Sequence, residues 1–298
     1  MGKTLKREHR RLKYIAVVPS IITLMNALCG FASIHFAARG MHEPNGFWID
    51  NGKNLQITFF AASAWFIFIA MVCDALDGFV ARKSGSESEF GSELDSLSDV
   101  ISFGMAPAFL TLQLVAYELQ TSAEPLFGHW QGRLLWLTCG LYVCCTILRL
   151  ARFNVENSVE ESDHMTFSGL PSPAAAGTVA AFVLLHSDIG PEMAEKWPNL
   201  ANGLAGIIVY SLPLIMLLVG FLMVSRVPFA HFANKYIRGK KTFSYMVWAV
   251  PVILALWIKP QWTLAVASLI YVFSGLYGTI REKQKNIKTK KQTKEITQ

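Results

Sequence analysis

The chain has 298 residues, of which 52% are hydrophobic and only 16% are charged, and its mean hydropathy is +0.36. This balance lies far from that of an ordinary soluble domain and indicates an integral membrane protein. The net charge of +6 could suggest nucleic-acid binding, but its excess lies in two tails that flank apolar sequence. Such tails orient a membrane protein and attract anionic lipid headgroups, so nucleic acid is excluded as a partner.

Apolar stretches of nearly 20 residues, the length that crosses a hydrocarbon core about 30 Å thick, recur along the chain. They begin at Tyr14, Leu55, Val100, Leu134, Pro171, Leu204, Tyr245 and Trp262. The stretches from Pro171 and Tyr245 are short enough to form re-entrant or tightly packed helices instead. The sequence therefore predicts six to eight spans, with eight favoured. Residues 14–38 are too long for the apolar region of a signal peptide and are expected to remain as a helix.

Basic residues predict the orientation in the membrane. Lysine and arginine are concentrated before the first apolar stretch and after the last, so both termini are expected in the cytoplasm and the number of spans is even. The polar loops at 82–92 and 154–170 fall on the same side, which carries most of the remaining positive charge. Function is therefore expected to face the cytoplasm.

Four aspartates at the edges of two consecutive apolar stretches are the main anomaly of the sequence. Asp74 and Asp77 end the second stretch, and Asp95 and Asp99 precede the third. Spacings of three and four residues place each pair on one helix face, and the short loop between them makes the two helices antiparallel neighbours. Carboxylates at a membrane edge are costly and normally functional. The four side chains are expected to converge.

The charge around these aspartates points to bound cations. From Asp74 to Asp99 there are seven acidic and two basic residues, an excess of five negative charges. Carboxylates a few ångströms apart take up protons or bind cations, and Mg²⁺ or Mn²⁺ suits all-oxygen ligation. Four carboxylates can hold two divalent cations, an arrangement suited to phosphoryl transfer. Glu87, Glu89 and Glu93 are interpreted as solvated loop charges.

Small and basic residues accompany the aspartates at helical spacing. Gly78 and Ala81 follow Asp74 by four and seven residues, on the same face, and leave space for a ligand. Arg82 offers a guanidinium that can pair with phosphate. Gly91 similarly narrows the entrance to the third helix. These residues are therefore candidates for binding a phosphate-bearing substrate beside the metal site.

The pattern resembles the D-x-x-D-G-x-x-A-R-x8-G-x3-D-x3-D signature of the CDP-alcohol phosphatidyltransferase family. The matching residues are Asp74, Asp77, Gly78, Ala81, Arg82, Gly91, Asp95 and Asp99. The resemblance covers roughly residues 19–226. It implies a core of six transmembrane helices, usually homodimeric, in which the first three aspartates ligate metal. It also implies that Asp99 is both a ligand and the base that takes the proton from the attacking hydroxyl.

The first apolar stretch carries a second part of the resemblance. Residues 19–30 (PSIITLMNALCG) are similar to the family's P-N-x-x-T-x-x-N-x-x-x-G motif, with Ser20 in place of the usual asparagine. The resemblance implies that Ser20, Thr23 and Asn26 help to hold the CDP moiety of the lipid substrate.

Two further segments are similar to the family members that use L-serine as the acceptor. They are residues 148–155 (LRLARFNV) and 167–177 (FSGLPSPAAAG). Serine carries a carboxylate, so its pocket should contain a cation, and Arg149 and Arg152 are the candidates. Anchoring of the cytoplasmic helix end by positive charge is the alternative role for each.

The predicted protein is an all-α integral membrane enzyme with a six-helix core and about two extra C-terminal transmembrane helices. Residues 1–13 and 281–298 are basic cytoplasmic tails, 14–226 the catalytic core and 227–280 the additional helices. The resemblance implies transfer of a phosphatidyl group from CDP-diacylglycerol to L-serine by a homodimer surrounded by membrane lipid in a bacterial inner membrane.

Two alternatives to this activity remain at the level of the sequence. The acceptor could be choline, glycerol phosphate or inositol. A cation transporter would place acids near the middle of its spans and show repeated halves. Asp74 instead lies about 28 Å along the helix from Leu55, at the cytoplasmic edge, which favours the enzyme.

Overall fold

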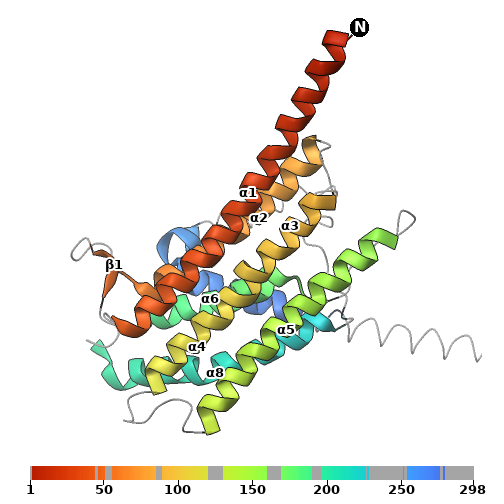
Figure 1. Ribbon diagram of the computed structural model, residues 1–298. Coiled ribbons are helices and arrows are strands. Elements are labelled where there is room, and N and C mark those ends of the chain that lie inside the picture. The colour runs from red at the N-terminus through yellow and green to blue at the C-terminus, as the bar shows by residue number, and fades with distance from the viewer. Residues whose placement is uncertain are drawn as a thin grey trace, which may run out of the picture.

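The computed structural model describes residues 2–43, 46–50, 56–84, 89–119, 130–159, 169–189, 196–225, 227, 251, 254–275 and 278. Its long helices are α1 (Gly2–His42), α2 (Phe59–Ser84), α3 (Glu89–Asp99), α4 (Ala106–Leu119), α5 (Trp130–Val159), α6 (Ser172–Ile189) and α8 (Pro198–Val224). A π-helix, η1 (Val100–Met105), joins α3 to α4. The helices form one bundle, beyond which the N-terminal part of α1 projects (Figure 1).

Five helical segments among the described residues are long and apolar enough to cross a membrane. They are Val18–His42, Phe59–Lys83, Glu89–Leu119, Trp130–Val155 and Pro198–Val224. The 18-residue α6 and a helix at 260–275 also belong to the bundle, and most side chains of α6 are buried. This architecture confirms the prediction of an all-α integral membrane protein. The number of spans stays a prediction, because much of the apolar stretch from Tyr245 lies outside the described residues.

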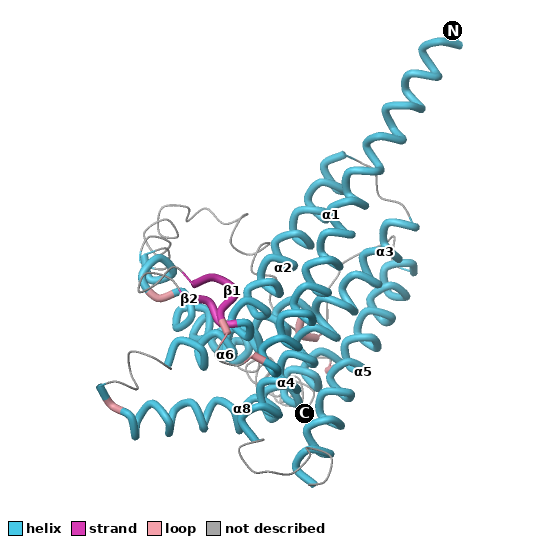
Figure 2. The backbone as a smooth tube through the Cα atoms, turned by 60° about the vertical axis from the view of Figure 1, so that its left-hand side comes forward, coloured by secondary structure: helices cyan, strands magenta, loops and turns pink. Residues whose placement is uncertain are grey.

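A short antiparallel hairpin in the connection between α1 and α2 was not expected from the sequence. It pairs β1 (Phe47–Asp50) with β2 (Gln56–Thr58) and lies against the bundle (Figure 2). The ring of Trp48 packs against Phe36 of α1 and Phe66 of α2, with centroids 5.2 and 5.6 Å apart. These aromatic contacts, which no local pattern reveals, fasten the hairpin to both helices.

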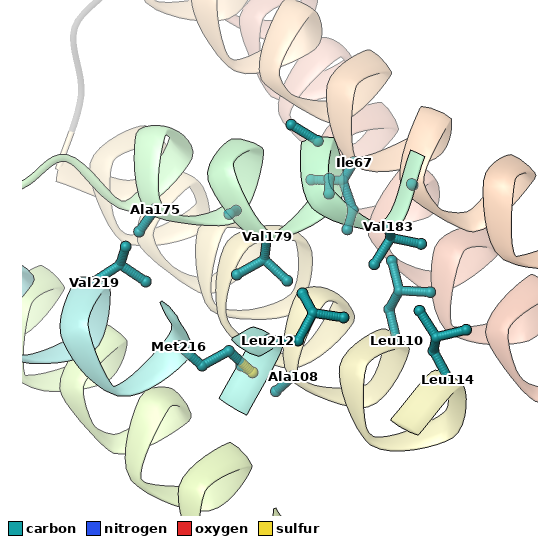
Figure 3. Packing of buried hydrophobic residues seen from close by; sticks show 14 of the residues in the cluster. Ile67, Ala108, Leu110, Leu114, Ala175, Val179, Val183, Leu212, Met216 and Val219 are labelled. Carbon is teal, nitrogen blue, oxygen red and sulfur yellow. The ribbon is translucent and has the colours of Figure 1, made fainter. Parts of the chain in front are cut away.

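The apolar core lies where α2, α4, α6 and α8 meet. Figure 3 shows Ile67, Leu110, Val179 and Leu212 from these four helices packed together, and each is fully buried. Interiors of this kind are packed as densely as organic crystals, so the four helices have little freedom to shift against one another. The helices that bear the candidate site are therefore held on a rigid scaffold.

Glycines allow two of the closest helix contacts. A Cβ atom on Gly30 of α1 would lie 2.6 Å from the Ser102 Oγ atom and 2.7 Å from its Cα atom, so only glycine fits where α1 meets η1. A Cβ atom on Gly177 of α6 would lie 3.2 Å from the sulfur of Met71. The first contact brings α1 against the segment that directly follows Asp99.

Candidate active site

Three of the four predicted aspartates converge between α2 and α3, about ten residues away from the loop that joins the two helices. Carboxylate oxygens of Asp74, Asp95 and Asp99 all lie within 4.8 Å of one another. Asp77 lies one turn further along α2; it is buried but does not belong to this group of three. Thr23 of α1 lies close to its carboxylate, and Asp95 is within electrostatic range. The predicted convergence of four aspartates is therefore found for three of them, and the role of the four as metal ligands stays a prediction.

The donor set fits a divalent cation. Within the described part of the chain, Asp77 Oδ2 and Asp95 Oδ1 are buried without a hydrogen-bond partner. A buried carboxylate oxygen with no partner costs free energy that a cation would recover. Mg²⁺ and Mn²⁺ prefer oxygen ligands, and the group of three consists of carboxylates. The cluster of aspartates therefore has both the chemistry and the unmet bonding capacity of a metal site.

Asn26 of α1 orients Asp99. The side chain of Asn26 is fully buried, and its Nδ2 atom donates a hydrogen bond to Asp99 Oδ1 at 3.2 Å. The motif in the first stretch implied that Asn26 helps to hold the CDP moiety. In the structure its Nδ2 atom points to the aspartate, and the CDP-binding role stays a prediction. A hydrogen bond to one carboxylate oxygen fixes the plane of the group and leaves the second oxygen for other partners.

The π-helix η1 begins directly after Asp99. Isolated π segments are frequent at functional sites, where they redirect side chains. Two hydrogen bonds hold this one: Ser102 Oγ donates to the Asn26 carbonyl at 2.8 Å, and the Tyr142 hydroxyl donates to the Phe103 carbonyl at 2.9 Å. The segment is therefore held from both α1 and α5. No residue spacing in the sequence predicted this π-helix.

Arg149 of α5 faces the aspartates. Its guanidinium is within electrostatic range of both Asp74 and Asp99. The Nη1 atom donates a 2.6 Å hydrogen bond to the hydroxyl of Ser172, the first residue of α6. Arg152 lies almost one turn further along α5 and is half-buried. Of the two predicted acceptor residues, the structure thus brings Arg149 to the aspartates, and the role of Arg152 stays a prediction.

The chain that leads into α6 explains how Ser172 reaches Arg149. Gly169 adopts a positive φ of 104°, a conformation that side chains rarely tolerate. Its amide donates to the Val227 carbonyl at 2.9 Å, and the Leu170 amide donates to the Leu222 carbonyl at 3.0 Å. These bonds dock the start of α6 on the end of α8, and so set the position of the Ser172 hydroxyl.

The remaining predicted substrate residues lie near the aspartates on α1, α2 and α3. Thr23 donates to the Pro19 carbonyl at 2.9 Å, and Ser20 is half-buried one turn before it. The Arg82 guanidinium lies over Gly78, where an added Cβ would be 3.3 Å from its Nη1 atom. Ala81 and Gly91 are also half-buried. Their proposed contacts with a nucleotide stay predictions.

One polar pair beside the site was missed from the sequence. Ser96 lies on α3 between the third and fourth aspartates, and Asn154 lies on α5. Ser96 Oγ donates to Asn154 Oδ1 at 3.1 Å, and Asn154 Nδ2 donates to Ser96 Oγ at 3.0 Å. The asparagine was visible in the LRLARFNV segment, but only the fold shows that it ties α5 to the helix that carries the aspartates.

Comparison with known proteins gives the family of this chain. Named relatives include CDP-diacylglycerol–serine O-phosphatidyltransferases from Methanocaldococcus jannaschii, which is 33% identical over 72% of this chain and 83% of its own, and from Helicobacter pylori, 32% identical over 74% and 80%. A Bacillus subtilis protein of the same name is 31% identical over 72% of this chain and 90% of its own. The sequence model of the CDP-alcohol phosphatidyltransferases matches residues 16–217, which include every aspartate of the cluster. The chain therefore belongs to the CDP-alcohol phosphatidyltransferase family.

Proposed function

We propose that the protein transfers the phosphatidyl group of CDP-diacylglycerol to L-serine and releases CMP. The observation that carries this proposal is the Arg149 guanidinium within electrostatic range of Asp74 and Asp99, two members of the aspartate cluster. Metal-binding carboxylates suit a pyrophosphate, and a guanidinium suits the carboxylate that distinguishes serine from choline, glycerol phosphate and inositol. The names of the relatives agree with serine as the acceptor.

Two divalent cations, Mg²⁺ or Mn²⁺, complete the site in this proposal. Asp74, Asp77, Asp95 and Asp99 would hold them through their carboxylate oxygens, two of which are otherwise without a partner in the described structure. Bound there, the cations would neutralise the pyrophosphate and stabilise the charge that develops on CMP. The Arg82 guanidinium, close to Gly78, is positioned to pair with a phosphate oxygen as well.

Asp99 acts as the base. It accepts the proton of the serine hydroxyl, the freed oxygen attacks the phosphorus that bears diacylglycerol, and the bond from that phosphorus to CMP breaks. CMP leaves with the bonding electron pair, and Asp99 later passes its proton to solvent. Asn26 keeps one oxygen of Asp99 occupied through the 3.2 Å hydrogen bond, so the other is presented in a fixed direction. No covalent enzyme intermediate is needed.

The substrates approach from different parts of the bundle. Ser20, Thr23, Ala81 and Gly91 lie near the aspartates on α1, α2 and α3, where they would contact the CDP moiety. Arg149 approaches from α5 and would bind the serine carboxylate, with Arg152 as the second candidate. The enzyme is proposed to work as a homodimer in a bacterial inner membrane, with its site and both termini in the cytoplasm.

An acceptor assay tests the proposal. CMP release would be measured with purified protein in detergent micelles, CDP-diacylglycerol and Mg²⁺ or Mn²⁺. One acceptor would be added at a time: L-serine, choline, glycerol 3-phosphate or inositol. Serine should support the fastest release of CMP, and phosphatidylserine should accumulate in equal amount. Faster CMP release with any of the other three acceptors at equal concentration would show that the serine assignment is wrong.

A further inference from the structure

The hydroxyl of Ser172 is a buried partner of the Arg149 guanidinium. Ser172 is 0% exposed, and the Arg149 Nη1 atom donates a hydrogen bond to its Oγ atom at 2.6 Å. The two residues belong to α6 and α5, so this contact depends on how two helices pack. Hydrogen bonds from a charged donor are stronger and shorter than those between neutral groups. Ser172 therefore does more than fill space at the alanine-rich start of α6.

The backbone fixes the position of Ser172 independently of the arginine. Two amide hydrogen bonds, from Gly169 to Val227 and from Leu170 to Leu222, hold the preceding segment against the end of α8. A Cβ atom on Gly169 would lie 2.5 Å from the carbonyl oxygen of Met223, so the chain can approach α8 this closely only through glycine. The Ser172 hydroxyl is thus a preformed acceptor.

The hydrogen bond to Ser172 leaves most of the guanidinium available. Arginine has five N–H donors in a rigid planar fork, and Ser172 accepts from one of them. Two parallel hydrogen bonds to a carboxylate require that plane to be correctly oriented. A guanidinium that is already held in one orientation loses less conformational freedom when the carboxylate binds. Because Ser172 is neutral, it orients the arginine without neutralising its charge.

We propose that Ser172 is a positioning residue of the acceptor site. Its hydroxyl holds the Arg149 guanidinium in the orientation that binds the carboxylate of an amino-acid acceptor. The proposal rests on the proposed function, because it assumes that Arg149 binds the acceptor. Ser172 acts on acceptor affinity through the arginine and leaves the aspartates and the CDP moiety untouched.

Two substitutions of Ser172 separate its hydrogen bond from its volume. Ser172→Ala removes the hydroxyl, whereas Ser172→Cys nearly keeps the volume but offers only a weak acceptor. In both variants the KM for serine should rise about 5- to 10-fold, the scale of losing one hydrogen bond of this kind. Both kcat and the KM for CDP-diacylglycerol should change less than about twofold.

Ser187→Ala on the same helix is the matched control. The Ser187 hydroxyl donates to the Val183 carbonyl of its own helix at 3.1 Å, near the opposite end of α6. Loss of this local bond leaves the start of α6 unchanged. The variant should therefore resemble the wild type in kcat and in both KM values.

A double variant shows whether Ser172 acts through Arg149. In an Arg149→Lys background the guanidinium is already lost, so adding Ser172→Ala should raise the KM for serine by less than about twofold more. An unchanged KM in Ser172→Ala, a wild-type KM in Ser172→Cys, a loss spread equally over kcat and both KM values, or full additivity would each overturn the proposal. These outcomes presuppose a wild type that uses serine. A wild type without serine-dependent CMP release would overturn the proposed function, and this inference with it.

Discussion

The metal-binding half and the acceptor half of the site are built in different ways. The metal-binding half comes from Asp74 to Asp99, a stretch of consecutive helices whose aspartates meet within 4.8 Å. The proposed acceptor half joins Arg149 of α5 to Ser172 of α6 through a 2.6 Å hydrogen bond. The aspartates lie close together in the sequence, whereas the proposed acceptor half depends on how helices that are distant in the sequence pack. The difference suggests that phosphoryl chemistry and acceptor choice can be altered separately.

Removal of divalent cations should have the largest effect and should affect the metal-binding half alone. Excess chelator is expected to abolish CMP release, because the buried carboxylates would repel the pyrophosphate that they otherwise bind through cations. Activity should return when Mg²⁺ or Mn²⁺ is added back in excess. Full activity in chelator would contradict the two-metal site. If serine protected the enzyme against loss of activity in chelator, acceptor binding and metal binding would not be separate.

Asp99→Asn should lower kcat by about 10²-fold or more, because the amide cannot accept the serine proton. Binding of CDP-diacylglycerol, measured by the labelled lipid retained on the protein, should survive much better. Asp74→Asn is the comparison variant, since loss of a metal ligand should weaken metal-dependent lipid binding as well as turnover. Recovery of normal turnover by Asp99→Asn at high metal concentration would show that Asp99 is only a ligand.

Arg149→Lys should weaken acceptor binding without affecting the metal-binding half. Lysine keeps the charge but loses the planar fork that binds a carboxylate through two hydrogen bonds. The KM for serine is expected to rise about tenfold, with a much smaller change in the KM for CDP-diacylglycerol. Arg152→Lys provides the parallel measurement for the other candidate. If Arg152→Lys raises the KM for serine more than Arg149→Lys does, the acceptor carboxylate is bound one turn further along α5.

Gly30→Ala tests whether the contact between α1 and η1 belongs to the metal-binding half. The added Cβ would lie 2.6 Å from Ser102 Oγ and would separate the two segments, which should cost about 1–3 kcal/mol of unfolding free energy. At a permissive temperature kcat should fall only a few-fold, with an unchanged KM for serine. Gly203→Ala on α8 is the control, because a Cβ there meets no atom within 4 Å. Equal thermal unfolding of the two variants in detergent would contradict the steric argument.

The fold class and the aspartate cluster could be predicted from the sequence because both depend on short-range regularities. Apolar stretches long enough to cross a membrane predicted the helices. Spacings of three and four residues predicted that the four aspartates would meet, and Asp74, Asp95 and Asp99 do so. The positive charge at 148–155 likewise predicted that Arg149 or Arg152 binds the acceptor, and this role stays a prediction. Each of these signals is contained within one helix or one pair of neighbouring helices.

Only the tertiary structure decided which polar groups serve the aspartates. Asn26 is 73 positions from Asp99, and Ser172 is 23 positions from Arg149, so neither pairing follows from a helical period. The hairpin at β1 and β2 was likewise invisible, because it is held by aromatic rings of other helices. A residue's spacing along the chain determines which face it shares, but its partner across the bundle depends on how side-chain volumes pack between helices. For that reason the sequence located the chemistry, and the packing selected the side chains that orient it.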